Sequence, residues 1–536
     1  MKTSASLGKN LDVSAITLED LRLQKEKLEE ERAVLLSRLE ETETKIIAVQ
    51  AEYGAVYNKA TKLLKLPPEV TCMIFTCAAA GYSRERKKWG EKARSGAVPL
   101  LPEVVVSHVC RYWRAVSLSY PRLWTSFRYN GACHELSPVD RFKAYLERSA
   151  NLDLKLWIDF SLVIMEEDRA INLSMLQLAV AHAQRWNRVT LMLDPESKIL
   201  PEITRRLKAL HVPKLEHFAL CSEGDEIDLG RRNSNRVPLV DLKTTIFKSG
   251  APRLSSVHLD GATYIKCSPP MANITALRIE PDVVAAPRQV YNGKAILSIL
   301  RLPSLEHLSL VGVLFELQDI SSLHTIEMNK LKSLRFSDHD AMCLLLAYIR
   351  APLLDMLTIQ SVCLPAEFGT LTSFGREPYF FPSLNRLNVL DVSVTTSLGA
   401  EFLISLTQTA KEIMFAQDDY EDGILLLIPE IYSDHPFWPK LEQLSVNMDV
   451  EDEMDSILHL ISMDGRPQTK LTLFVPSSIK KTWKSTEEDY DMLVCLCDIK
   501  VLQPKGFGAS TWPPSQDQSN YQFWWEQDDP FEIDEI

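Results

Sequence analysis

Apolar residues recur in a heptad pattern over residues 18–63. One heptad position holds Leu18, Lys25, Arg32, Leu39, Ile46, Tyr53 and Ala60, and the other holds Leu21, Leu28, Leu35, Thr42, Val49, Val56 and Leu63. Charged residues flank this seam, so the pattern predicts a long helix that pairs as a coiled coil, within the chain or between chains. The alternative is a single amphipathic helix packed on its own domain. Residues 1–17 precede the pattern and are expected to be disordered.

Two consecutive prolines, Pro67 and Pro68, follow this helix and should end it, because proline disfavours helical geometry in the preceding residue. Helical periodicity returns over 104–118, after a basic stretch at about 79–100 that we interpret as a solvated insertion. The sequence therefore predicts a small all-α module over 64–127.

A third pattern, x-P-x-L-x-x-L-x-L, recurs along the rest of the chain. Its first apolar position falls at residues 186, 215, 254, 274, 305, 331, 354, 384, 410, 441 and 468. The mean spacing of about 28 residues lies in the range of leucine-rich repeats, and helix-like segments separate the copies. The pattern predicts an α/β fold over 150–503: an irregular solenoid with a curved parallel sheet and helices on its convex side. The alternative is an ordinary α/β domain with accidental repetition.

Within each predicted strand the leucines should point inward and the residues between them should share the concave face. We expect that face to be open to solvent or covered only by the C-terminal tail. A continuous polar surface of this kind suits target binding, although it could also be a merely solvated face. The candidate target-binding residues are His217, Ser256, His258, His307, Ser309, Arg335, Thr358, Arg386, Asn388 and Gln443.

Composition narrows the possible functions. Apolar residues make up 46% of the 536 residues, which allows a large core, and the net charge of -13 disfavours a nucleic-acid partner. No apolar run is long enough to span a membrane, and no signal-like segment opens the sequence. We therefore expect a cytoplasmic or nuclear protein with reduced thiols.

Motifs that would indicate an enzyme are missing from the sequence. It contains no phosphate-binding loop, no H-E-x-x-H and no G-x-S-x-G. Cys495-Leu496-Cys497 lacks a partner pair at zinc spacing. We expect no catalytic residue, no metal and no cofactor. Residues 504–536 form an irregular, acidic and aromatic tail that either docks on a basic surface or stays disordered.

The predicted all-α module resembles an F-box, in the fungal form that has a coiled coil in front. The resemblance rests on Leu66-Pro67-Pro68-Glu69-Val70 with Ile74-Phe75, on Val109 to Arg114, and on Ser119-Tyr120-Pro121-Arg122-Leu123-Trp124. It covers about an eighth of the chain and departs from the family in the long insertion between the two halves. The repeats are similar to the irregular leucine-rich repeats that often follow an F-box.

This resemblance implies a docking module. F-boxes bind the Skp-type adaptor of an SCF ubiquitin ligase, which links them to a cullin, and the repeats would hold an unknown target protein. The positions that would contact the adaptor are Leu66, Pro67, Pro68, Val70, Ile74, Val109 and Trp113. The alternative is a non-enzymatic scaffold with a coiled coil and a leucine-rich-repeat surface that is not tied to a ligase.

Overall fold

The structure is a computed structural model in which the chain divides into two compact units. Unit 1 contains Met1–Ile74 and His108–Val116, and unit 2 contains Phe75–Ser107 and Ser117–Ile536. The residues that the structure describes are 7–85, 101–130, 137–160, 166–193, 199–222, 244–259, 267–279, 290–311, 314–316, 324–337, 340–364, 381–394, 397–416, 424–431, 437–447, 453–463, 470–484, 487–502 and 512.

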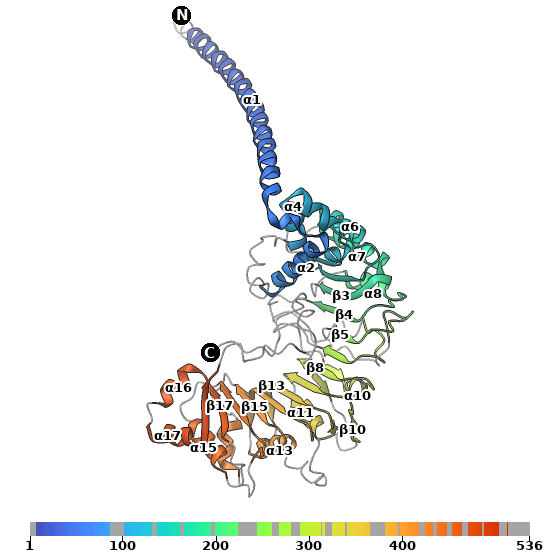
Figure 1. Cartoon of the computed structure of the whole chain (residues 1–536), viewed down its shortest axis with the longest axis vertical. Coiled ribbons are helices and arrows are strands. Elements are labelled where there is room, and N and C mark those ends of the chain that lie inside the picture. Colours follow the sequence, from blue (N-terminus) through green and yellow to red (C-terminus); the bar gives the residue numbers. More distant parts are fainter. Residues whose placement is uncertain are drawn as a thin grey trace, which may run out of the picture. The chain divides into compact units, whose positions relative to one another are not determined.

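The predicted N-terminal helix is present as α1, Leu7–Ala60 (Figure 1). It begins earlier than expected, so residues 7–17 are helical and the prediction of disorder there is wrong. The reason is local: the sequence contains no proline before Pro67 to interrupt the backbone hydrogen bonds. A short 3-10 helix, η1 (Lys62–Lys65), follows α1.

Four helical segments account for the predicted all-α module: α2 (Pro68–Glu85), α4 (Pro102–Val109), α5 (Arg111–Leu118) and the 3-10 helix η3 (Pro121–Trp124). Pro68 is the first residue of α2, as the motif predicts. Helix α2 runs into the expected insertion at 79–100, because the alanines at 78–80 favour helix. Residues 86–100 of that insertion lie outside the described part.

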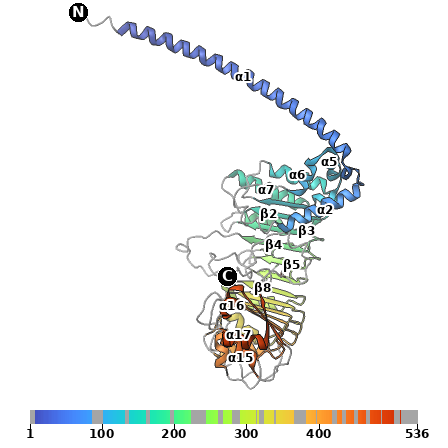
Figure 2. The same cartoon turned by 60° about the vertical axis from the view of Figure 1, so that its left-hand side comes forward.

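Unit 2 is built on a sheet of fourteen parallel strands, each hydrogen-bonded to the strand before it in sheet order. The strands are β1 Ser126–Asn130, β2 Leu154–Phe160, β3 Trp186–Leu193, β4 His217–Ser222, β5 Ser256–Leu259, β6 Ala276–Ile279, β8 His307–Val311, β11 Ser333–Ser337, β13 Met356–Leu364, β14 Arg386–Val394, β15 Glu412–Ala416, β16 Gln443–Asn447, β17 Leu471–Val475 and β18 Cys497–Val501. Figures 1 and 2 show strands of this sheet side by side in colour order, from teal to red.

Helices and two small strand pairs connect these strands. The helices are α6 Pro138–Arg148, α7 Glu166–Ala181, η4 Ala183–Arg185, α8 Leu200–Leu207, α10 Gly293–Leu300, α11 Asp340–Leu346, α13 Ser397–Thr407, α14 Ile424–Leu427, η6 Ile428–Glu430, α15 Glu453–Ser462, α16 Ser477–Trp483 and α17 Glu487–Leu496. The small parallel pairs are β7 (Val290–Asn292) with β9 (Leu314–Glu316), and β10 (Ile326–Glu327) with β12 (Ile349–Arg350).

The eleven copies of the repeat pattern correspond to eleven consecutive strands of the sheet, β3 to β17. Most of these strands begin two residues after the first apolar position; Leu215, for example, precedes β4 at His217. The pattern did not mark β1, β2 or β18. In β1 part of the signal was available: Pro121 and Leu123 precede it, and the buried Phe127 and Tyr129 follow one position later than the leucines of the other copies. The sheet therefore begins at Ser126, before the expected start at residue 150.

One face of the sheet is apolar and packs against the helices. Alternate residues such as Leu308, Leu334 and Leu387 are fully buried and belong to a cluster that also holds Ile296 of α10 and Leu403 of α13. Figure 1 shows α10, α11 and α13 along one side of the strands. The inward positions at 215, 254, 334 and 387 are all buried, as the alternation predicts.

The segment from Ser117 to α6 lies at one end of this core. The indole Nε1 of Trp124 donates to the Ser117 carbonyl at 2.8 Å, and its ring lies edge-on to Tyr145 at 5.1 Å between centroids. Tyr145 donates to the buried Glu103 carboxylate at 2.6 Å. Burial and this carboxylate raise the pKa of Tyr145 well above its ordinary value. Trp124 is thus a core residue.

Candidate interaction surfaces

The seven positions that the F-box resemblance assigns to adaptor binding all lie in unit 1, and none of them is buried. We call them the apolar patch. Pro67, Pro68, Val70, Ile74 and Val109 are exposed, and Leu66 and Trp113 are half-buried. Val109 is the most open of the aliphatic members, at 55% exposure. A core position would be shielded from water, so these exposures are those of a surface.

Local hydrogen bonds hold the patch in shape. The Tyr112 hydroxyl donates to the Leu66 carbonyl at 2.9 Å, which ties the segment before α2 to α5. The Pro67 carbonyl accepts from the Thr71 backbone amide at 3.1 Å in the first turn of α2. At the start of α5, Cys110 Sγ accepts from the Trp113 amide at 3.4 Å. Leu66 and Tyr112 are therefore held together although they lie 46 positions apart in the sequence.

Two exposed apolar residues of unit 1 extend the set that the sequence identified. Met73 is 67% exposed and lies one turn after Val70 on α2, and Leu63 is 44% exposed in η1. Residues three positions apart are neighbours on a helix surface, so Met73 lies beside Val70. The motif did not mark Met73, but the i, i+3 relation to Val70 was a signal that could have found it.

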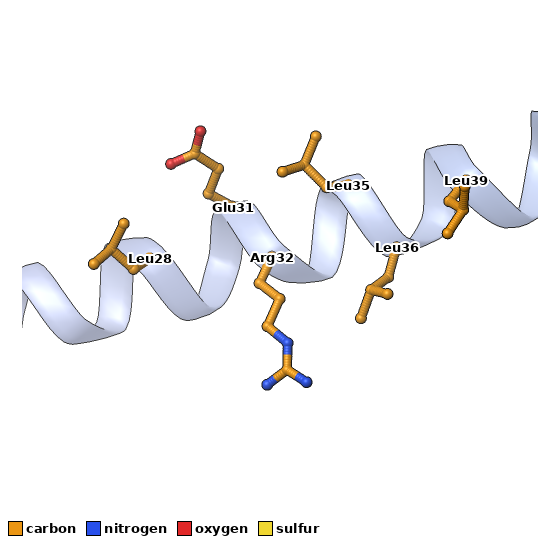
Figure 3. Close-up of a pocket in the computed structure, with 6 residues that line it drawn as sticks. All are labelled: Leu28, Glu31, Arg32, Leu35, Leu36 and Leu39. Atoms are coloured by element: carbon orange, nitrogen blue, oxygen red, sulfur yellow. The ribbon is translucent and has the colours of Figure 1, made fainter.

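The heptad seam of α1 is a second apolar surface in unit 1. Its leucines at 18, 21, 28, 35 and 39 are all more than half exposed. Figure 3 shows Leu28, Leu35 and Leu39 projecting from the helix beside Arg32, around a shallow depression. The exposure of these side chains along a 54-residue helix means that no described part of the chain covers the seam.

The ten predicted target-binding residues lie on the sheet face opposite the apolar one, which we call the polar face. The strand registers align His307, Ser333 and Met356 in one row and Ser309, Arg335 and Thr358 in the next. The same registers continue to His217, Ser256 and His258 on one side, and to Arg386, Asn388 and Gln443 on the other. All ten candidates therefore share a face.

The polar face is less open than we expected. His217, His258, His307, Ser309, Arg335 and Thr358 are buried, and only Arg386 of the ten is exposed. Parallel strands lie about 4.8 Å apart, so short side chains shield one another. Cross-strand hydrogen bonds add to this: His217 pairs with Ser256 at 3.0 Å, and Asn388 donates to Thr358 at 3.0 Å. These six positions are not open to solvent, which corrects that part of the expectation; at His307 and Arg335 the tail residue Trp512 lies against them, as the other part of the expectation has it.

A basic character distinguishes the first eight strands of the polar face. Two rows across β1 to β11 contain five basic residues and three histidines but no acidic residue. The basic residues are Arg128, Lys155, Arg188, Arg278 and Arg335. Acidic residues enter these rows only at Glu412 and Asp498, near the other end of the sheet. The whole chain has a net charge of -13, so this part of the polar face is positively charged although the protein as a whole is acidic.

One residue of the C-terminal tail, Trp512, lies on this basic part of the polar face. It is buried, and its indole Nε1 donates to Ser333 Oγ at 3.1 Å. The ring stands edge-on to His307, with 6.1 Å between centroids, and Arg335 lies 4.5 Å from the ring centroid. Sequence patterns left two alternatives for the tail, docking or disorder, and Trp512 is docked. The rest of residues 504–536 lies outside the described part.

The burial of His307 changes its acid–base behaviour. Loss of water contact lowers the pKa of its imidazole to about 4; the Lys332 ammonium contributes in the same direction, and Glu306 opposes it. The imidazole is therefore neutral near pH 7.

The described residues contain neither a cluster of metal-ligating side chains nor a helix that could span a membrane. Among the described residues, no three His, Cys, Asp or Glu side chains gather as metal ligands would. None of the helices in the described ranges combines the length and apolar character that a bilayer crossing requires. The nine cysteines whose positions are described are free thiols.

Comparisons with known proteins do not identify the chain. No protein-family model matches the sequence, and the search of curated proteins found no match.

Proposed function

We propose that the protein is a substrate-recognition adaptor of an SCF-type ubiquitin ligase. In this proposal the apolar patch docks on the Skp-type adaptor, which connects to a cullin, and the sheet is an irregular leucine-rich-repeat solenoid whose polar face holds a target protein. The chain itself performs no covalent chemistry. It raises the effective concentration of the target near the ligase.

The observation that carries the proposal is the exposure of the apolar patch. Seven residues that a small helical domain would bury as its core are all at least partly open to solvent. Exposed apolar residues with an aromatic neighbour are the usual core of a protein–protein interface. The order of the parts agrees with this proposal: a motif resembling an F-box precedes fourteen parallel strands, eleven of which the repeat pattern predicts.

A co-purification experiment tests the proposal. The full chain is used to capture a Skp-type adaptor and a cullin, and their affinity for a V70S/V109S variant is compared with that for the unchanged chain. Loss of two interface anchors should weaken adaptor binding at least tenfold, since such residues typically contribute about 2 kcal/mol or more each. Both side chains are exposed, so the melting temperature should hardly change.

Val494→Ser is the matched control, because Val494 is also an exposed valine, at 41%, but lies on α17. It should bind the adaptor like the unchanged chain. If the unchanged chain captures no Skp-type adaptor, the scaffold alternative, with the same polar face but no ligase, replaces the proposal.

A further inference from the structure

The contacts of Trp512 are those of a bound ligand group rather than of a chain passing over a surface. Only 4% of the residue is exposed, and its single polar atom is satisfied by Ser333 Oγ, 179 residues earlier in the sequence. Guanidinium groups lie within 4.5 Å (Arg335) and 5.8 Å (Arg278) of the ring centroid. Buried tryptophans usually need a partner for the indole N–H, and the ring face attracts cations.

The residues around the indole are themselves held in place by the sheet. They come from three adjacent strands, β6, β8 and β11. Arg335 is 4% exposed, and its Nε donates to Ser309 Oγ at 2.6 Å, which fixes the guanidinium beside the ring. Nδ1 of His307 is buried and has no hydrogen-bond partner in the described structure. Buried polar atoms normally have a hydrogen-bond partner, so the Nδ1 atom of His307 could bind a polar group of a ligand beside the indole.

Charge indicates which sequences would reach this site. The first eight strands of the polar face present five basic residues and no acidic one in the two rows described above. In the sequence, the residues that follow Trp512 contain seven acidic residues and no basic one. An acidic segment that carries a tryptophan therefore matches the face in charge and supplies the indole that Ser333 and Arg335 contact, and electrostatic complementarity favours its encounter with the face.

We propose that the polar face at β6, β8 and β11 is a recognition site for a tryptophan side chain in an acidic segment, and that Trp512 occupies it as an internal ligand. The next step rests on the proposed function: the target protein presents an acidic segment with a tryptophan, and this segment must displace the tail. The tail thereby holds the site closed to weak ligands, because an attached competitor acts at a high effective concentration.

A peptide assay on the full chain tests this site. The probe is a fluorescein-labelled peptide with the sequence of residues 506–536, and its binding is followed by fluorescence anisotropy. The unchanged chain should bind it weakly, because its own tail competes. Trp512→Ala in the full chain should bind it at least tenfold more tightly. Ser333→Ala, which removes only the acceptor of the indole N–H, should reduce the affinity of the Trp512→Ala chain several-fold.

Matched substitutions locate the binding. In the Trp512→Ala chain, Arg335→Gln should weaken peptide binding at least tenfold, whereas Arg253→Gln, an exposed arginine in a turn before β5, should change it less than twofold. In the peptide, alanine at the Trp512 position should cost at least tenfold, and alanine at both Trp524 and Trp525 should cost much less. Unaltered melting temperatures of the variants exclude misfolding as the cause.

Two results would overturn the proposal. One is equal peptide affinity for the unchanged chain and the Trp512→Ala variant. The other is displacement of the labelled peptide by a 20-nucleotide single-stranded DNA at lower concentration than by unlabelled peptide, which would assign the basic face to nucleic acid. The assay contains no Skp-type adaptor, so either result leaves the test of adaptor docking unaffected, and loss of adaptor docking would leave the peptide result unaffected.

Discussion

Adjacent residues on one strand have very different roles in this protein. Leu308 is fully buried on the apolar face of β8, and Ser309, the next residue, points to the polar face and accepts the hydrogen bond from Arg335. The sequence pattern assigned Ser309 to an open surface, where substitutions are nearly neutral. In the structure Ser309 is buried and bonded to the Arg335 guanidinium, so its replacement should lower the free energy of unfolding.

Leu308→Ala and Ser309→Ala should both destabilise the protein, for different reasons. The first leaves a cavity in the core and should cost about 2–5 kcal/mol. The second leaves the buried Arg335 Nε without its acceptor and should cost about 1–3 kcal/mol. Chemical denaturation of the full chain measures both, with the exposed Lys330→Ala as a control that should stay within about 0.5 kcal/mol. A Ser309→Ala variant as stable as the control would contradict the structural account.

The stability of the protein should fall as the pH drops from about 6.5 to about 4, in part through His307. Its folded pKa of about 4 lies below the ordinary value of about 6.5, so in this window the unfolded chain binds a proton that the folded chain does not. The free energy of unfolding therefore decreases with falling pH, by up to about 3 kcal/mol from this group. The Lys332 ammonium also lowers the pKa of His307, whereas the Glu306 carboxylate raises it.

His307→Gln should remove this part of the pH dependence. Unfolding free energies of the variant and the unchanged chain, measured between pH 7 and 4, should differ in slope in this window. Parallel curves would show that His307 does not titrate as its burial indicates.

At the scale of elements, α1 differs from the other helices because its apolar side is not covered by any described part of the chain. Helices such as α10, α13 and α15 bury apolar residues in the core of the sheet, whereas every large apolar seam residue of α1 from Leu18 to Val56 is more than half exposed. In proteins, most of the stability of a helix comes from the packing of its apolar face rather than from local propensity. Pairing with a second copy would bury the seam, which is the between-chain alternative of the coiled-coil prediction.

The full chain should therefore self-associate through α1. Sedimentation at micromolar concentration should give a mass above that of one chain, and Leu35→Pro should return it to a single-chain mass. Proline inside a helix costs about 3 kcal/mol and would interrupt the seam at its centre. The control is Glu30→Ala, which changes a residue of α1 outside the seam. This variant should keep the larger mass. A single-chain mass for the unchanged protein would contradict self-association.

At the scale of the whole molecule, the core of unit 2 is continuous from one end of the sheet to the other. One apolar cluster extends from Trp124, beside β1, to Cys497 in β18. Each strand of this sheet is stabilised mainly by the strands and helices next to it. Neighbouring strands should therefore unfold together.

Core substitutions far apart in the sheet should consequently lower one shared unfolding transition. Leu156→Ala in β2 and Leu473→Ala in β17 each remove a fully buried side chain. Calorimetry of the full chain should show both variants shifting the same transition to lower temperature. Two transitions that respond separately to the two substitutions would show that the array unfolds in independent parts.

The local patterns of the sequence determined much of this architecture. Prolines placed the start of α2, and the spacing of leucines placed eleven strands and their buried residues, because helix and strand periodicity depend only on near neighbours. Tertiary structure decided the rest. Which polar residues are buried depends on neighbours one strand away, and the pairing of β1 with β2 established a strand that the repeat pattern had not marked. The docking of Trp512 on Ser333 and Arg335 joins residues nearly 180 positions apart, and no periodic pattern carries information over that separation.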